Sequence, residues 1–308
     1  MDCDLKTSSP QSDFGDFVQT FQIEDLNIRG RLIRLDQAYN DAIASHAYPP
    51  AIKQLIGETM VLCAILASAL KYDGVFTLQV QGDGPVSLVM ADITSDGAMR
   101  AYANLREGLG EDDIPGNSIQ QTVGVGHMAF TVDQGPETER YQGITELTGA
   151  TLAECAHNYF RQSEQLETAI AISASTGDAD GPAHAAGLMV QRLPSSRDGE
   201  QEEENWRRAV VLMSSITPQE LLDPGLSASH LLYRLYHEDG VRLYVQRVLR
   251  HECRCSEERV SRTLRSFPRA EIDDMAEDGK ITVTCEFCRT DYVYDADRLD
   301  ALYADVPD

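Results

Sequence analysis

The alternation of apolar and polar residues predicts an N-terminal domain that mixes strands and helices. Residues 76–80 alternate apolar with polar side chains, Gly-Asp-Gly-Pro at 82–85 turns the chain, and alternation resumes over residues 86–90. This pattern is typical of a β-hairpin. Residues 17–36 and 128–132 also have the composition of strands. Because strands and helices interleave only partly, the fold class that we predict is α+β.

One long helix is predicted over residues 51–71, after the helix-stopping sequence Tyr48-Pro49-Pro50. It is apolar nearly all round after Met60, which indicates burial at the centre of the domain. The longest uncharged apolar run, Met60 to Leu70, is shorter than the roughly 20 residues that span a bilayer. The sequence therefore predicts no membrane segment.

The middle of the chain has short helical patterns and few apolar residues. Ser, Gly and Glu dominate residues 194–204 and mark a domain boundary, whereas residues 173–181 have the composition of a surface loop. Helices are predicted around residues 206–213 and 231–236, and between them Thr217 to Glu220 has the sequence of a capping box. This segment cannot form a core by itself, so we expect it to pack on another domain and to be able to detach.

Two cysteine pairs near the C-terminus carry the strongest chemical signal. Cys253-Arg-Cys255 and Cys285-Glu-Phe-Cys288 are separated by 29 residues, in which two helices are predicted, and the second pair lies on the turn of a predicted hairpin at 280–294. Four thiolates form a closed tetrahedral zinc site with no position for a catalytic water. His251 in place of one thiolate, or four unrelated cysteines, are the alternatives.

The spacing within each pair also allows each to close as a disulfide. Loops this short constrain the unfolded chain by only about 2 kcal/mol apiece, whereas structural zinc contributes roughly 10–16 kcal/mol to the folding of small domains. Oxidation should therefore unfold the zinc domain.

Charge and cysteine content narrow the function further. The 308 residues include 50 acidic and 26 basic ones, and the net charge of -24 disfavours binding to nucleic acid and to anionic membranes. Eight arginines lie between residues 241 and 270, where they would favour thiolates and would also permit local nucleic-acid binding. Seven cysteines without an apparent export signal predict a reducing, cytoplasmic location.

The other candidate residues are expected to be structural. Cys63 and Cys155 lie on apolar helical faces, Cys3 has no assigned role, and His127 and His157 are isolated. No Gly-rich phosphate loop occurs, so an enzyme is not predicted. A thiol oxidoreductase that uses the second cysteine pair remains an alternative, as does a zinc domain that binds nucleic acid.

The chain resembles the 33-kilodalton heat-shock family of redox-regulated bacterial chaperones. The likeness covers most of the chain and includes the C-terminal CxC and CxxC pairs. The other matching segments are Glu-Asp-Leu-Asn-Ile-Arg-Gly-Arg at 24–31, Tyr-Pro-Pro at 48–50, Gln-Gly-Asp-Gly-Pro at 81–85, Glu-Arg-Tyr-Gln-Gly-Ile at 139–144, Ser-Glu-Gln at 163–165, Ala-Gly at 186–187, Gln-Arg-Leu-Pro at 191–194 and Leu-Tyr-His-Glu at 235–238.

Residues 1–13, which have the composition of a flexible polar tail, fit the family pattern poorly. For the rest of the chain the resemblance implies an α+β core (14–198), a helical redox-responsive linker (199–250) packed on the core, and a zinc domain (251–308). It implies one Zn²⁺ per chain and a reduced, zinc-bound, monomeric form that is inactive. On oxidation Cys253 would pair with Cys255 and Cys285 with Cys288, zinc would leave and the linker would unfold. The oxidised homodimer would then hold unfolded client proteins without ATP and prevent their aggregation.

Overall fold

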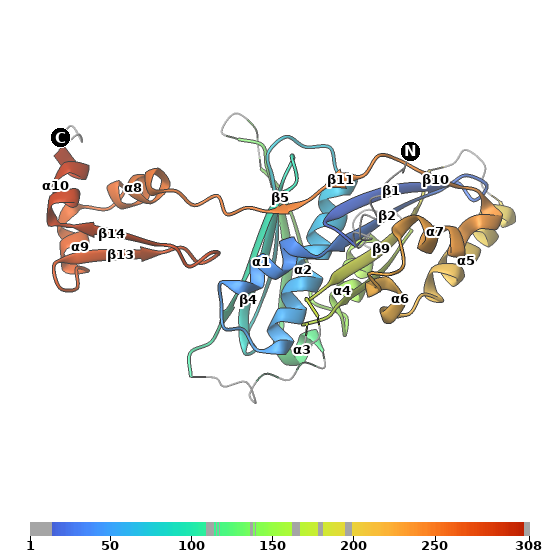
Figure 1. Cartoon of the computed structure of the whole chain (residues 1–308), viewed down its shortest axis with the longest axis horizontal. Helices are drawn as coiled ribbons and strands as arrows, with labels where there is room; N and C mark the ends of the chain where they lie inside the picture. Colours follow the sequence, from blue (N-terminus) through green and yellow to red (C-terminus); the bar gives the residue numbers. More distant parts are fainter. Residues whose placement is uncertain are drawn as a thin grey trace, which may run out of the picture. The chain divides into compact units, whose positions relative to one another are not determined.

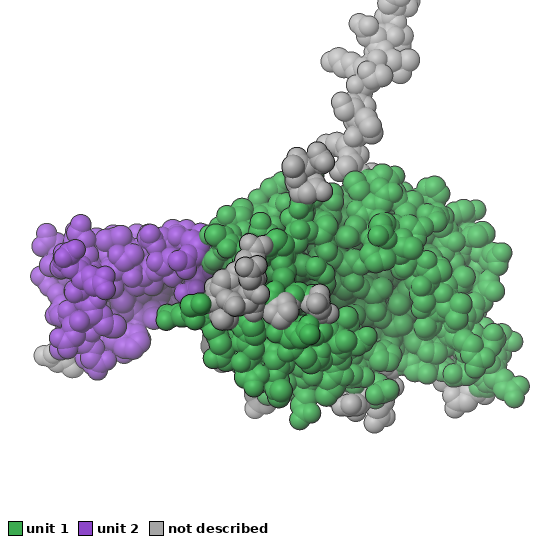
Figure 2. All heavy atoms as spheres, turned by 90° about the horizontal axis from the view of Figure 1, so that it is seen from below, with its two compact units in different colours: residues 1–251 green, residues 252–308 purple. Residues whose placement is uncertain are grey.

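Residues 14–108, 114, 116, 118–135, 138, 140–161, 167–177, 181–194 and 199–304 are described by the computed structural model (Figure 1). The chain divides into two units, residues 1–251 (unit 1) and residues 252–308 (unit 2) (Figure 2). The predicted tail at 1–13 with Cys3, the segment at 163–165 and parts of the segments 139–144, 173–181 and 194–204 lie outside the described residues.

Unit 1 contains two six-stranded sheets, the first built on antiparallel pairs. Phe21 of the first strand lies opposite Gly30 of the second, and a Cβ atom at Gly30 would come within 2.0 Å of the Phe21 ring. Glycine at this position therefore lets the ring lie across the neighbouring strand. The strands in order are β10 (Val241–Leu243), β1 (Phe17–Ile23), β2 (Ile28–Leu35), β9 (Ala185–Arg192) and β8 (Thr168–Ala174), and β11 (Arg247–Val248) also pairs with β1.

The second sheet contains the predicted hairpin. Its two strands pair from Val75 opposite Thr94 to Gln81 opposite Leu88, which confirms the alternation of residues 76–90. The order of its strands is β12 (Arg250–His251), β5 (Ala98–Leu105), β4 (Val86–Thr94), β3 (Val75–Gly82), β6 (Gly126–Asp133) and β7 (Tyr141–Glu146).

Helix α2 (Pro50–Ala69) contacts strands of both sheets and forms the centre of the main core of unit 1. It is long and apolar enough to cross a membrane by length and composition, but 72% of its most apolar 18 residues are buried inside the protein. Burial of this extent is that of a core helix, and it confirms the interpretation of residues 51–71. The other helices of this core region are α1 (Gln37–Ala44), α3 (Ile119–Thr122) and α4 (Leu152–Tyr159).

The outer face of the first sheet is covered by the helices of the middle segment. They are α5 (Glu200–Ser214), α6 (Pro218–Leu222) and α7 (Ala228–Tyr236), followed by a 3-10 turn at His237–Asp239. Their apolar side chains and those of β1, β2 and β9 form a second core cluster (Figure 1). Thr217 and Glu220 form the predicted capping box. As expected from its composition, the segment has no core of its own.

Residues 241–251, which we call the strap, are extended rather than helical. Their short strands β10 and β11 pair with β1, and β12 pairs in parallel with β5. Arg247 donates to the carbonyl oxygens of Thr94 and Ser95, and Leu249 is buried in the main core. The expectation of a helical linker extending to residue 250 is therefore wrong for this last part, because strand partners from unit 1 hold it extended.

Unit 2 is a small domain with its own apolar cluster. Helix α8 is capped by the Ser256 hydroxyl, which accepts from the amide of Arg259. The predicted hairpin is present, and Ile281 and Tyr294 lie opposite each other in it and are both buried. The elements are α8 (Glu257–Arg265), α9 (Arg269–Asp274), β13 (Lys280–Thr284), β14 (Asp291–Asp295) and α10 (Ala296–Ala304).

Candidate metal centre

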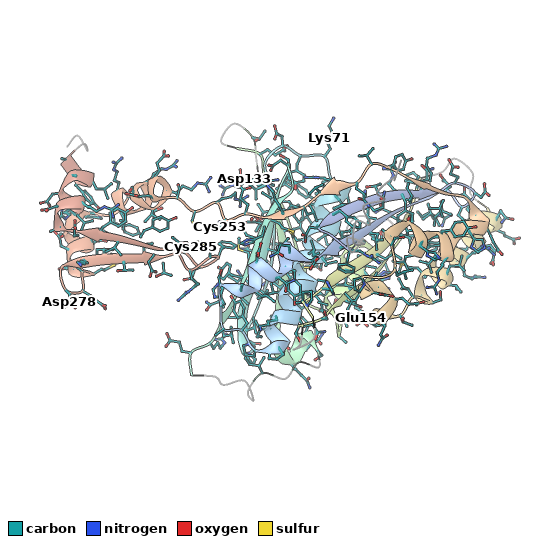
Figure 3. All side chains as sticks on the ribbon, viewed as in Figure 1. Lys71, Asp133, Glu154, Cys253, Asp278 and Cys285 are labelled. Atoms are coloured by element: carbon teal, nitrogen blue, oxygen red, sulfur yellow. The ribbon has the colours of Figure 1, made fainter. Side chains whose placement is uncertain are left out.

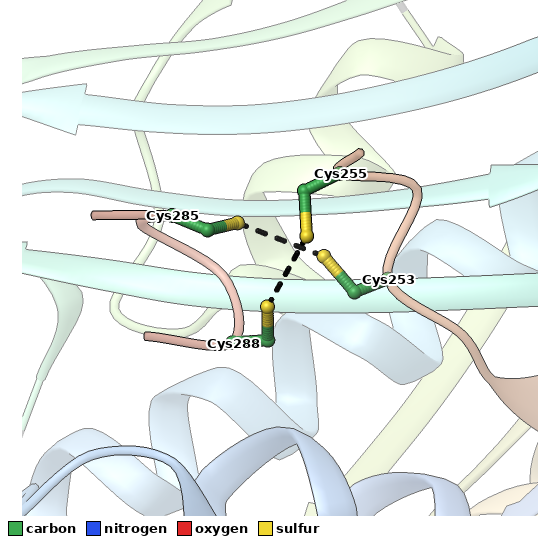
Figure 4. Close-up of side chains that lie close together, drawn as sticks. All are labelled: Cys253, Cys255, Cys285 and Cys288. Atoms are coloured by element: carbon green, nitrogen blue, oxygen red, sulfur yellow. Dashed lines mark hydrogen bonds between the residues drawn. The ribbon is translucent and has the colours of Figure 1, made fainter. Parts of the chain in front are cut away.

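Four cysteine sulfurs converge in unit 2 from segments far apart in the sequence (Figures 3 and 4). Cys253 and Cys255 precede α8, and Cys285 and Cys288 lie on the turn between β13 and β14. The Sγ atoms of Cys253 and Cys285 are 3.7 Å apart, those of Cys255 and Cys288 are 3.4 Å apart, and all four lie within 4.8 Å of one another.

The β13–β14 turn presents its two sulfurs to the same point because its backbone is closed by hydrogen bonds. The amide of Cys285 donates to the carbonyl of Thr290 at 2.9 Å, and the amide of Arg289 donates to the carbonyl of Cys285 at 2.8 Å. Arg289 has a φ of 56°, a left-handed conformation that reverses the chain after Cys288. These backbone bonds place the sulfurs of Cys285 and Cys288 on the same side of the turn, facing Cys253 and Cys255.

Hydrogen-bond donors surround the sulfurs. The backbone amides of Phe287 and Cys288 donate to Cys285, and the amide of Thr290 donates to Cys288, whose sulfur also lies 3.2 Å from the Thr290 hydroxyl. On Cys255 the donor is a side chain, because the Tyr292 hydroxyl donates to its sulfur at 3.1 Å.

The electrostatics of the cluster favour a bound cation. Burial raises the pKa of Cys255 to about 12, and the neighbouring sulfurs raise it as well, whereas the hydrogen bond from Tyr292 opposes the shift. Burial also raises the pKa of Cys285. Burial would raise the pKa of Cys288 too, but its hydrogen bonds with Thr290 and with neighbouring sulfurs lower it to about 6. Four close sulfurs cannot all be thiolates unless a cation balances their charge.

The donor set fits zinc. Zinc–sulfur bonds of about 2.3 Å in a tetrahedron place the sulfurs about 3.8 Å apart, close to the 3.4 and 3.7 Å of the two closest contacts. Four protein sulfurs fill a tetrahedral site and leave no position for water or substrate. Among the described residues, the four cysteines are the group whose ligand atoms lie close enough together to hold one metal ion. His251, the alternative ligand, is not a member of it.

The remaining candidate residues lie elsewhere. Cys63 on α2 and Cys155 on α4 are fully buried, and burial raises the pKa of each thiol. His157 donates from Nδ1 to the carbonyl of Thr168 at 2.7 Å, and His127 lies on β6. The positions of these two cysteines and two histidines are consistent with a structural role.

Several arginines of residues 241–270 pair with carboxylates. Arg242 pairs with Glu24 and Arg250 with Asp96, while Arg269 pairs with Asp273 and Asp300. Arg247 and Arg265 donate to backbone carbonyls. That the arginines of this segment favour thiolates stays a prediction.

Sequence reasoning missed Tyr292 and Thr290 as contacts of the sulfurs. Thr290 directly precedes β14 and Tyr292 lies in it, and side chains two residues apart share one face of a strand. That alternation is a signal in the sequence, but it does not tell which hydroxyl reaches which sulfur.

Comparison with known proteins places the whole chain in context. The family model described as Hsp33 protein matches residues 16–295. The 33 kDa chaperonin of Caulobacter vibrioides is 38% identical over 291 residues, covering 91% of this chain and 95% of its relative. The 33 kDa chaperonin of Vibrio cholerae is 37% identical over 285 residues, covering 92% and 94%. The crystal structure of the Thermotoga maritima 33 kDa chaperonin, 22% identical, has a TM-score of 0.77 and covers 94% of this chain and 98% of that one.

Proposed function

This chain belongs to the Hsp33 family, a family of chaperones, and from that premise we propose that it is a redox-regulated, ATP-independent holdase. In this proposal it binds unfolding proteins under oxidative stress and prevents their aggregation. The observation that carries the proposal is the convergence of four cysteine sulfurs in a unit with only a small apolar core. One Zn²⁺ per chain, bound by Cys253, Cys255, Cys285 and Cys288, is the proposed cofactor of the reduced form.

The proposed oxidant is a hydroperoxide. One thiolate of a pair attacks the peroxide, forming a sulfenic acid and releasing hydroxide. The second thiolate of the pair attacks that sulfur, so that a disulfide forms and a second hydroxide leaves. Two peroxides oxidise both pairs, after which no thiolate remains to bind the metal.

The pairing decides whether unit 2 stays folded. Disulfides within the pairs, Cys253–Cys255 and Cys285–Cys288, close loops of three and four residues, each contributing about 2 kcal/mol, and neither joins the two cysteine segments. A disulfide between Cys253 and Cys285 would close a 33-residue loop, contribute about 4 kcal/mol and hold the segments together. Since bound zinc contributes roughly 10–16 kcal/mol in small domains, oxidation within the pairs is the route that unfolds unit 2.

Unfolding of unit 2 acts on the linker through the strap, which ends two residues before Cys253. We assign residues 14–198 to the core, 199–250 to the redox-responsive linker and 251–308 to the switch domain. Undocking of the linker would uncover the second core cluster, in which Phe21, Leu32 and Leu188 of the sheet are fully buried under the linker helices. An apolar sheet face of this kind is suited to unfolded polypeptides.

The proposed partners are unfolded client proteins and, in the oxidised state, a second copy of the chain, with a monomer as the reduced form. The net charge of -24 keeps such complexes soluble and disfavours nucleic acid as a partner. We place the protein in the cytoplasm, where thiols stay reduced until stress occurs.

The test measures three quantities in one sample of the zinc-loaded protein treated with hydrogen peroxide at mild heat. We expect about one zinc released per chain, mass-spectrometric disulfides within each pair, and a gain in suppression of the aggregation of a thermally unfolded substrate. A thiol reductant should reverse the disulfides. Zinc release without a gain in aggregation suppression would refute the holdase.

A further inference from the structure

Two side-chain hydroxyls contact the sulfur cluster: that of Thr290 lies 3.2 Å from the Cys288 sulfur, and that of Tyr292 binds Cys255. The Oη atom of Tyr292 lies 3.1 Å from the Cys255 sulfur, within range of a sulfur-accepting hydrogen bond. Cys285 and Cys288 receive backbone amides, which no side-chain substitution removes. The donor on Cys255 can therefore be deleted by a single change that keeps the ring.

The strand geometry holds the hydroxyl in place. Tyr292 lies in β14 opposite Val283 of β13 and packs against the apolar cluster of unit 2. Two residues further, on the same strand face, Tyr294 is buried and its hydroxyl lies 2.9 Å from that of Ser261. The ring of Tyr292 is thus positioned by the sheet, independently of the bond that its hydroxyl makes to sulfur.

A hydrogen bond to a metal-bound thiolate has two chemical effects. It stabilises the folded arrangement in which the sulfur is a ligand, as groups around a metal site generally do. It also withdraws electron density from sulfur, which lowers its nucleophilicity toward peroxide, because thiolate reactivity rises with basicity.

From this geometry we propose that Tyr292 is a positioning residue of the redox switch, whose hydroxyl protects the Cys255 thiolate and sets the peroxide concentration at which the switch opens. The inference rests on the proposed function in taking the four cysteines as zinc ligands. The new element is Tyr292, which is not itself a ligand and which determines how readily the four cysteine ligands are oxidised.

The perturbation is Tyr292→Phe in the full chain, which removes the hydroxyl and keeps the ring. The matched control is Tyr303→Phe, because Tyr303 is a half-buried tyrosine of unit 2 whose hydroxyl donates to the carbonyls of Leu264 and Phe267 and not to sulfur. Thr290→Val is a second comparison, since the amide of residue 290 still donates to Cys288.

Three measurements report on the sulfur. Zinc affinity, from competition with a chelator, should fall by about 10-fold in Tyr292→Phe, the lower end of the range for groups that support metal ligands. Peroxide-driven zinc release should become about three-fold faster for each unit by which the substitution raises the basicity (pKa) of the Cys255 thiolate. After substitution by Co²⁺, the sulfur-to-cobalt charge-transfer band should move to lower energy.

The control variant should match the parent in all three measurements, and Thr290→Val should show smaller changes than Tyr292→Phe. The proposal is overturned if Tyr292→Phe matches the parent, or if Tyr303→Phe produces the same changes, which would show a general loss of unit 2 stability. None of these measurements uses chaperone activity. A parent protein that releases zinc without suppressing aggregation would refute the holdase and leave the role of Tyr292 standing.

Discussion

Leu232 on α7 offers a direct test of whether docking of the linker helices keeps the protein inactive. Its side chain is fully buried in the cluster between these helices and the first sheet. The neighbouring residue, Tyr233, is 60% exposed. Substitution of each by alanine therefore compares loss of packing against the sheet with loss of a surface side chain on the same turn of one helix.

The expected magnitude follows from this burial. Leucine to alanine in a packed core costs about 2–5 kcal/mol, and alanine is itself a good helix former, so the cost falls on packing rather than on the helix. At 1.4 kcal/mol for each factor of ten, the population with an undocked linker rises about 30-fold to 4,000-fold. Tyr233→Ala should change the docking free energy by no more than about 0.5 kcal/mol.

Amide hydrogen exchange measures the change in each segment. In reduced, zinc-bound Leu232→Ala, protection of α5 and α7 should fall while that of the core helix α2 is retained, and the protein should suppress aggregation of a thermally unfolded substrate without an oxidant. Equal protection in Leu232→Ala and Tyr233→Ala would refute the docking argument. Equal loss of protection in α2 and α7 would show that the linker does not open separately from the core.

Three further outcomes follow from the cysteine cluster and from a half-buried histidine. Cys285→Ser should weaken zinc binding by orders of magnitude whereas Cys3→Ser should not, and a chelator competition that finds equal affinities would contradict the ligand assignment. Because the pKa values of Cys255 and Cys285 are raised, zinc must displace at least two protons, so its affinity should fall by about 100-fold per pH unit below neutrality; a flat profile would exclude thiolate ligation. Burial and Arg34 lower the pKa of His184 against the opposing effect of Asp36. Its contribution to stability is therefore fully present above the unfolded pKa of about 6.5 and is lost as pH falls below that value and through the lower folded pKa. In His184→Gln, the free energy of unfolding, measured by chemical denaturation, should depend less on pH in this range. An unchanged pH dependence would exclude His184 as its cause.

Local sequence patterns were sufficient for the central helix and for the cysteine segments. The burial of α2 could be predicted because residues after Met60 are apolar on every face, and such a helix has no stable position except inside a core. The hairpin on which Cys285 and Cys288 lie could be predicted because strand alternation and a turn occur within 15 residues of sequence. Structure that depends on contacts between residues close in sequence can therefore be predicted from local sequence patterns.

The strap could not be predicted in the same way. Its strands have two or three residues each, too few for alternation to distinguish them from a helix or a loop. Its extended form is imposed by β1 and β5, and the pairing of Phe21 with Leu243 joins residues more than 200 positions apart. The bond from Tyr292 to Cys255 was missed for the same reason, since it depends on how two distant segments meet.

The strap gives a physical reason why events in unit 2 would reach the linker. Residues 193–240 lie between β9 and β10, so that their two ends are held while both strands stay paired. Undocked helices held in this way form a closed loop of 48 residues, and closure of such a loop costs roughly 3 kcal/mol of chain entropy. If unfolding of unit 2 frees the strap, the undocked linker gains that entropy. This gain is of the same order as the packing lost in Leu232→Ala, so oxidation and the mutation should open the linker to a comparable extent.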